Sequence, residues 1–279
     1  MSTICEVTID KKENFVYFFC VNGKNINKLN NDNIDIESKS YYLVNSFRKH
    51  YQDKLYALIP SFFKDTQYDV NSESKEFYNK NNIEIIYFNH KLLNEKTLYK
   101  EKKRLLLANK CYAFKKMCQV FSKAKIIFFD TDLILTQEIP ITIDMLSFDF
   151  CGVLTDTIGG YSESLIKMYN LSITNNTFFT LKDKIEMKFA YFNSGFFIAE
   201  ADIDVAECWC VVFEQLFTTY DKNIFPIEEQ VALSVALNMK NKKVFILDRK
   251  YNYSYHILKS KSDDTIIYHY HNENPSELI

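Results

Sequence analysis

The sequence predicts a single α/β domain with a mixed, mostly parallel central sheet flanked by helices. Short apolar runs alternate along the chain with longer segments of helical periodicity, which is typical of strands covered by helices on both faces. Of the 279 residues, 47% are hydrophobic and 16% are aromatic, so a sizeable core can form and disorder is disfavoured. No linker divides the chain, so we expect one domain over residues 1–279.

The first half of the chain is expected to alternate between strands and helices, an order that indicates a parallel sheet. The last strand of this half has no polar residue and is therefore expected to be central. The expected elements are a strand at 15–21, a helix at 41–50, a strand at 54–59, a helix at 73–80, a strand at 83–88, a helix at 100–121 and a strand at 126–129.

The second half is less regular. Residues 155–188 have weak periodicity and are expected to form a loop with a helix near 163–169. The other expected elements are strands at 149–154 and 192–199, helices at 201–220 and 228–239, and strands at 244–247 and 265–269.

Charge, cysteine content and hydropathy exclude several protein classes. The net charge is −2, without the one-sided basic field that nucleic-acid binding needs. The 7 cysteines include no Cys-x-x-Cys pair and are expected to be reduced thiols. No stretch reaches the ~20 apolar residues of a transmembrane helix, and the first residues lack the features of a signal peptide. We therefore expect a cytoplasmic protein without a membrane span.

The motif with the clearest chemistry is Asp130-Thr131-Asp132, directly after the apolar run at 126–129. In open α/β sheets, ligands gather beyond the carboxyl ends of such strands. Two carboxylates on a tight turn can converge on one hard divalent cation, which can bridge a diphosphate and neutralise its charge as it leaves. The same spacing also occurs on solvated surface turns, so the motif needs support from the rest of the chain.

Four segments, in the right order, resemble the glycogenin-like family of retaining glycosyltransferases (glycosyltransferase family 8), whose single domain has the fold called GT-A. They are the Asp-x-Asp segment at 128–135, a Phe-Asn-Ser-Gly strand at 192–198, the Glu-Gln pair at 229–230 and an apolar-histidine segment at 267–270. The first hundred residues fit only as a strand–helix–strand pattern. The resemblance implies a nucleotide-binding part at about 10–135 and an acceptor- and sugar-binding part at about 136–279.

The resemblance implies a metal site in which Asp132 and His269 ligate Mn²⁺ or Mg²⁺, and imidazole favours Mn²⁺ because it is softer than carboxylate. Asp130 would contact the ribose and also the metal. Lys110 would meet the diphosphate or the donor sugar. His271 lies further along the same strand; we expect it to point to the other face and not to ligate.

The resemblance also implies a sugar pocket. Asn193 and Ser194 would face it, because amides and hydroxyls pair with sugar hydroxyls. Gly195 would let the backbone approach the ligand closely. Glu229 and Gln230 would lie beneath the reacting sugar. The implied reaction moves a hexose or N-acetylhexosamine from a UDP-sugar to a hydroxyl of a glycan or protein acceptor with retention of configuration. The family often dimerises, so the resemblance also suggests a homodimer.

The chain departs from the family pattern in two places. Asn274 stands where the family has a lysine that grips the leaving diphosphate, and Lys259, Lys261 or Lys110 are candidates to replace it. Glu229 replaces an aspartate, which keeps the carboxylate but lengthens the side chain. The missing lysine favours an alternative in which the domain binds nucleotide or glycan but reacts weakly or not at all.

A different enzyme class also places Asp-x-Asp after an apolar strand. In haloacid-dehalogenase-type phosphatases the first aspartate is a nucleophile and the second a general acid. Leu133 and Ile134 stand where that class has Gly and Thr, and no later acidic pair with an upstream lysine ends a strand. This alternative therefore ranks below the glycosyltransferase.

Overall fold

The computed structural model describes residues 15–23, 36–156, 162–173, 178–182, 184–219, 228–271 and 273–278. The expectation of no signal peptide concerns residues outside these ranges. Within them, no helix combines the length and hydropathy needed to cross a bilayer.

A seven-stranded sheet forms the centre of the described chain, with the strand order β10-β6-β9-β4-β1-β2-β3. Only β9 runs against its neighbours β4 and β6; the other pairs in this sheet are parallel. The prediction of a mixed, mostly parallel sheet is therefore confirmed. The strands are β1 (Phe15–Cys20), β2 (Leu55–Pro60), β3 (Ile83–Phe88), β4 (Lys125–Phe129), β6 (Phe150–Leu154), β9 (Phe192–Glu200) and β10 (Val244–Leu247).

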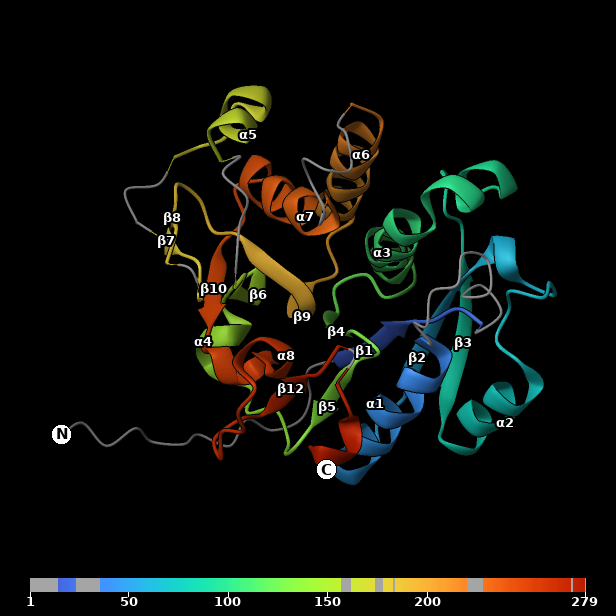
Figure 1. Cartoon of the computed structure of the whole chain (residues 1–279). Coiled ribbons are helices and arrows are strands. Elements are labelled where there is room, and N and C mark those ends of the chain that lie inside the picture. The colour runs from blue at the N-terminus through green and yellow to red at the C-terminus, as the bar shows by residue number, and fades with distance from the viewer. Residues whose placement is uncertain are drawn as a thin grey trace.

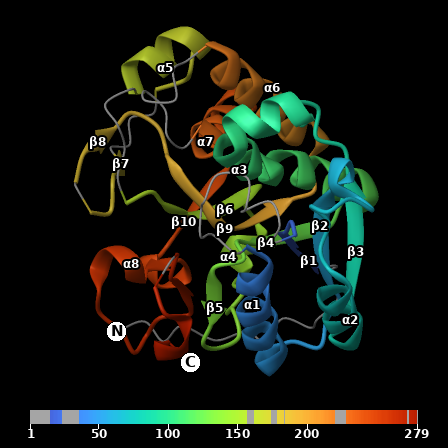
Figure 2. The same ribbon diagram turned by 45° about the vertical axis from the view of Figure 1, so that its right-hand side comes forward.

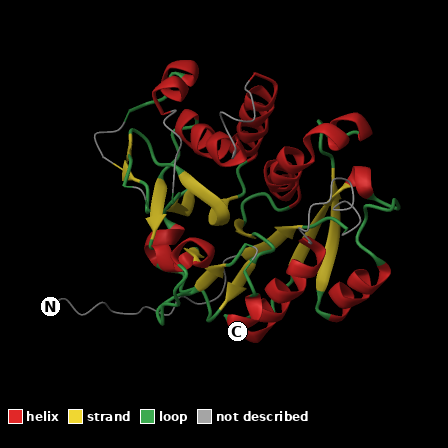
Figure 3. Cartoon of the chain, viewed as in Figure 1, coloured by secondary structure: helices red, strands yellow, loops and turns green. Residues whose placement is uncertain are grey.

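Helices cover both faces of this sheet (Figures 1, 2 and 3), with α3, α6 and α7 on one side and α1 and α2 on the other. Each face has its own hydrophobic core. In β1, Phe18 packs into the core under α3, α6 and α7, and the next residue, Phe19, packs into the core under α1 and α2. Both faces of β1 are therefore buried, and its apolar run is continuous. The helices are α1 (Ile36–His50), α2 (Ser72–Lys80), α3 (Glu95–Val120), α4 (Ile143–Leu146), α5 (Ser162–Tyr169), α6 (Ile203–Thr219), α7 (Glu228–Met239) and α8 (Tyr255–Leu258).

Two helices begin earlier than the hydrophobic pattern predicts. The first turn of α3 is polar, but Asn94 and Thr97 form a reciprocal capping box that satisfies its free N–H groups and starts the helix at Glu95. Likewise, α1 begins at Ile36 rather than near residue 41. Polar first turns carry little apolar periodicity, so their helical state is set by capping and tertiary contacts.

A small second sheet has the order β11-β12-β5 and joins distant parts of the chain. In it, β5 (Leu133–Leu135) pairs antiparallel with β12 (Ile267–His269), which pairs parallel with β11 (Tyr253–Ser254). The sequence pattern did not predict β5, because three residues show no period. A further two-stranded ribbon comprises β7 (Phe178–Phe179) and β8 (Glu186–Met187), inside the region expected to be mostly loop.

His90 is a buried histidine between β3 and α3 whose protonation should govern acid stability. Its Nε2 lies 3.2 Å from the carbonyl oxygen of Leu105, and its ring centroid lies 4.1 Å from that of Tyr112. Burial lowers the pKa of His90 to about 4. In the unfolded chain the imidazole of His90 becomes protonated below about pH 6.5, whereas in the folded chain it stays neutral down to about pH 4.

We therefore expect the free energy of unfolding to fall by about 2 kcal/mol from this one group between pH 7.5 and pH 5. Chemical denaturation of the wild type and of His90→Gln at both pH values measures it, because the variant lacks the titrating imidazole. An equal pH dependence in the two proteins would contradict the assignment.

Candidate functional site

The Asp130-Thr131-Asp132 turn lies at the carboxyl end of β4, where the sequence predicts a ligand site. Because β9 runs antiparallel to β4, its amino end lies at the same edge of the sheet. The N–H of Asp130 donates to the carbonyl oxygen of Gly195 at 2.8 Å. Two of the segments that the sequence singled out therefore meet through backbone pairing.

A buried polar network extends from Asp130 through three elements. Lys110, inside α3, donates to Asp130 Oδ2 at 2.7 Å and to Ser194 Oγ at 3.2 Å. Ser194 Oγ donates to Glu229 Oε1 at 3.1 Å, and Lys110 Nζ lies 3.8 Å from the same oxygen. Four predicted site residues thus form one connected group contributed by α3, β9, α7 and the end of β4.

The charges in this network are held in a protein interior. Burial raises the pKa of Asp130 to about 6, although Lys110 draws it down. Burial also opposes the charge on Lys110, but Asp130 and Glu229 outweigh it and raise the pKa of the lysine. At neutral pH, the buried Lys110 and the half-buried Asp130 therefore form an ion pair.

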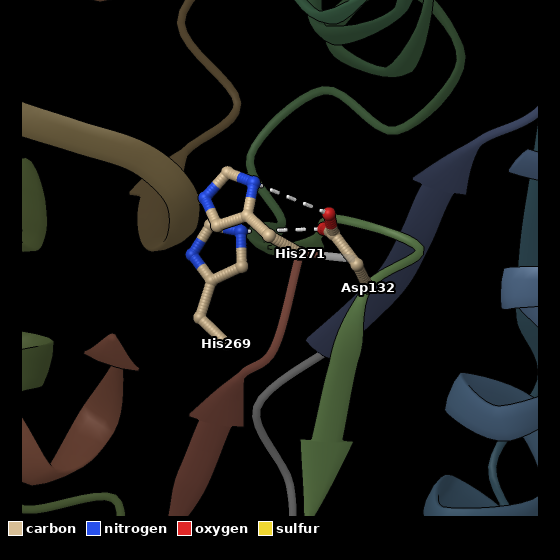
Figure 4. Close-up of side chains that lie close together, drawn as sticks. All are labelled: Asp132, His269 and His271. Atoms are coloured by element: carbon tan, nitrogen blue, oxygen red, sulfur yellow. Dashed lines mark ion pairs between the residues drawn. The ribbon is translucent and has the colours of Figure 1, made fainter. Parts of the chain in front are cut away.

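A second cluster forms around Asp132, two residues further along the same turn (Figure 4). Pairing of β5 with β12 sets His269 opposite Leu133, and the N–H of Tyr270 donates to the carbonyl oxygen of Asp132 at 3.1 Å. Asp132 Oδ1 lies 3.3 Å from His269 Nε2 and Asp132 Oδ2 lies 3.8 Å from His271 Nδ1. One donor atom from each residue lies within 4.8 Å of the others.

The expectation that His271 points to the other face is wrong. Residues two apart on a strand share a face, so His269 and His271 are expected on the same side. The strand itself ends at His269, and His271 follows in a left-handed conformation with φ 53°. The two imidazole rings stack with centroids 4.3 Å apart and planes 11° apart. Both side chains therefore reach the carboxylate of Asp132.

The donor set of this cluster fits a divalent cation. Carboxylate oxygens and imidazole nitrogens are ligands that Mn²⁺ and its neighbours accept. His269 is only 3% exposed, and neither of its ring nitrogens has a hydrogen-bond partner among the described residues. Burial raises the pKa of Asp132, but His269, and with it Lys39, outweighs burial and holds that pKa well below its usual range. Asp132 is therefore ionised and ready to ligate.

The remaining predicted residues surround these two groups. A Cβ on Gly195 would lie 2.8 Å from His269 Cε1, so the glycine makes room for the histidine ring. Asn193 Oδ1 accepts from the N–H of Gly195 at 2.8 Å and so braces the entry to β9. Gln230 lies in the first turn of α7 beside Glu229, and its buried Oε1 has no hydrogen-bond partner in the described part of the chain.

Lys39 is a site residue that sequence analysis missed. It lies on α1, far from any motif, and its Nζ is 3.3 Å from Asp132 Oδ2 and 5.7 Å from the ring centroid of Tyr270. By contrast, the candidate Lys259 pairs with Glu273 at the surface, and Asn274 caps a short 3₁₀ helix. Among the residues that the structure describes, the lysines that pair with the two aspartates of the motif are Lys39 and Lys110. A lone lysine on a polar helix gives no signal in the sequence.

The fold resembles that of two glycosyltransferases of known structure. Mouse xyloside xylosyltransferase 1 in its apo form is similar with a TM-score of 0.51 and 11% identity, over 92% of this chain and 98% of that chain. The bifunctional glycosyltransferase WbbM in its apo structure gives a TM-score of 0.50 and 12% identity, over 95% of this chain. The similarity covers 47% of the WbbM chain, so this protein spans about half its length.

Residues 31–240 match the model of the Rhodobacterales glycosyltransferase domain. The chain belongs to this family. The match includes Lys110, the Asp130-Thr131-Asp132 turn and Glu229, and it ends before β12, which carries the histidines. No curated protein sequence matches the chain.

Proposed function

We propose that this glycosyltransferase moves a hexose or N-acetylhexosamine from a UDP-sugar to an acceptor hydroxyl with retention of configuration, in the manner of the glycogenin-like enzymes. The observation that carries the proposal is the convergence of two groups at one edge of the sheet. One is the cluster of Asp132 and His269; the other is the network of Lys110, Asp130, Ser194 and Glu229.

In the proposed site, Asp132 and His269 hold Mn²⁺ or Mg²⁺. When bound, the cation neutralises the negative charge that develops on the departing diphosphate. Lys39, beside Asp132, and Lys110, beside Asp130, add positive charge at the Asp-x-Asp turn and take the place of the lysine that Asn274 replaces. These fixed charges stabilise the leaving group without reorganising at the moment of reaction.

Ser194 and Glu229 serve the sugar side of the proposed site. Glu229 is buried and is anchored by the Ser194 hydroxyl through Oε1, while its Oε2 has no hydrogen-bond partner among the described residues. A buried carboxylate oxygen of this kind can accept from a sugar hydroxyl or stabilise positive charge at the anomeric carbon. Asn193 and Gln230 bring amides to the same edge, and the acceptor hydroxyl attacks from the face that the diphosphate leaves.

A panel of UDP-sugars tests this function. We expect UDP release from one of UDP-glucose, UDP-galactose and UDP-N-acetylglucosamine in the presence of Mn²⁺, and loss of that release in EDTA. Proton NMR of the product should show the anomeric configuration of the donor. UDP binding by calorimetry without turnover of any donor would instead identify a binding domain, and turnover that survives EDTA would refute the role of the metal.

A further inference from the structure

The cluster around Asp132 contains two histidines, His269 and His271, whereas the family resemblance implies only His269 as a ligand. We propose that His271 is a protein ligand of the metal together with Asp132 and His269, and that Asp130 is not. This two-histidine, one-carboxylate set would bind Mn²⁺, Co²⁺ or Zn²⁺ in preference to Mg²⁺. The inference rests on the proposed function for the role of the metal, but the geometry that carries it is independent of the donor sugar.

The backbone brings the three ligands together from two distant segments. The β5–β12 pairing and the hydrogen bond from Tyr270 N–H to the Asp132 carbonyl oxygen fix the end of the turn beside the histidine segment. The left-handed turn at His271 then folds its ring back over that of His269. His256 of α8 packs against the outer side of His271, with ring centroids 3.8 Å apart, and supports this position.

The distances suit a shared cation. Two ligands that each lie about 2.1 Å from a metal are about 3–4 Å apart. Asp132 reaches His269 Nε2 at 3.3 Å and His271 Nδ1 at 3.8 Å, each through a different carboxylate oxygen. Small side-chain rotations therefore bring all three donors into one coordination sphere, with His269 buried and the His271 side chain 46% exposed toward solvent.

Asp130 is engaged elsewhere. Its Oδ2 accepts from the buried Lys110 at 2.7 Å, and Lys110 also contacts Ser194 and Glu229. The donor atoms that lie within 4.8 Å of one another belong to Asp132, His269 and His271, and Asp130 is not in that group. The two aspartates of the motif therefore have different roles: Asp130 orients Lys110, and Asp132 ligates the metal.

The donor set decides which cation binds. Mg²⁺ prefers oxygen ligands in octahedral geometry, whereas imidazole suits transition metals. Two imidazoles and one carboxylate leave positions open for other ligands. Histidine ligates a metal as the neutral imidazole, so in this set the carboxylate of Asp132 is the one charged ligand and two of the three donors are nitrogens.

Titration of the metal-stripped full-length chain with Co²⁺ alone, followed by its visible absorption, tests the proposal without nucleotide or sugar. We expect His271→Ala to weaken Co²⁺ binding at least about tenfold, as expected when a ligand is lost. Asp130→Asn removes a nearby charge but no ligand, so it should weaken Co²⁺ binding far less than His271→Ala does. The control His50→Ala, in the last turn of α1, should leave the Co²⁺ affinity unchanged. Mg²⁺ should compete only at much higher concentration.

X-ray absorption of the Co²⁺-loaded wild type provides a measurement that needs no variant, and we expect scattering from two imidazoles. One imidazole, or a loss of affinity in Asp130→Asn but not in His271→Ala, would overturn the inference. Co²⁺ binding that depends on His271 in a protein that turns over no UDP-sugar would leave this inference standing while the proposed function fails.

Discussion

Asp132→Asn is expected to lower kcat/KM for sugar transfer by roughly a thousandfold, the size of losing several kcal/mol of charge stabilisation in the transition state. The carboxylate of Asp132 faces His269, His271 and Lys39. The amide keeps the shape of the side chain but removes the negative charge that balances a divalent cation. Kinetics of UDP release at saturating Mn²⁺ measure the effect.

The matched control is Asp144→Asn, an exposed acidic residue in the short helix α4. It removes the same charge from the chain and should leave kcat/KM unchanged. Circular dichroism should show both variants folded. A kcat/KM of Asp132→Asn within a few-fold of that of the control would show that Asp132 has no essential part in sugar transfer.

Lys110→Met is expected to lower the free energy of unfolding by about 3–5 kcal/mol, because it leaves Asp130 buried without its cation. Methionine fills the space of the aliphatic stem, so the loss reports the charge rather than a cavity. For a chain of 279 residues the midpoint of thermal unfolding should fall by roughly 5 to 9 °C. Sugar transfer should fall as well, since the same ammonium group serves the proposed donor site.

Two further variants separate the ion pair from other causes. Lys110→Met combined with Asp130→Asn should recover part of the lost stability, because the unpaired charge is then absent. Lys115→Met, on the same helix, breaks an exposed pair with Glu207 and should cost no more than about 1 kcal/mol. The single variant Asp130→Asn completes the comparison. If the losses in free energy of unfolding of the two single variants add up to that of the double variant, the two residues are not coupled.

Much of the fold could be predicted because its signals are local. The apolar runs at β1, β2, β4 and β9 each mark a strand buried on both faces, and β3 is a less buried run at the edge of the sheet. The amphipathic stripe of α6 marks a helix. The three-residue strand β5 and the polar first turns of α1 and α3 were missed, since short or polar segments carry no period.

The candidate site was predictable in part. Asp130, Ser194 and Glu229 were selected through short motifs, and the structure joins them through Lys110. Lys39 could not be selected, because nothing near it in the sequence marks it. His271 was assigned to the wrong face although its two-residue spacing from His269 already predicts a shared face. The turn that follows β12 then sets the direction of its ring.

The sequence by itself determined the class of fold and the position of the Asp-x-Asp turn at the end of a buried strand, since both follow from hydrophobicity along neighbouring residues. Only the tertiary structure decided which groups surround each carboxylate. Pairing of β5 with β12 brings His269 and His271 to Asp132, and packing of α3 against the sheet brings Lys110 to Asp130. Such partners lie many residues apart, and only the register and packing of whole elements set the distances between them.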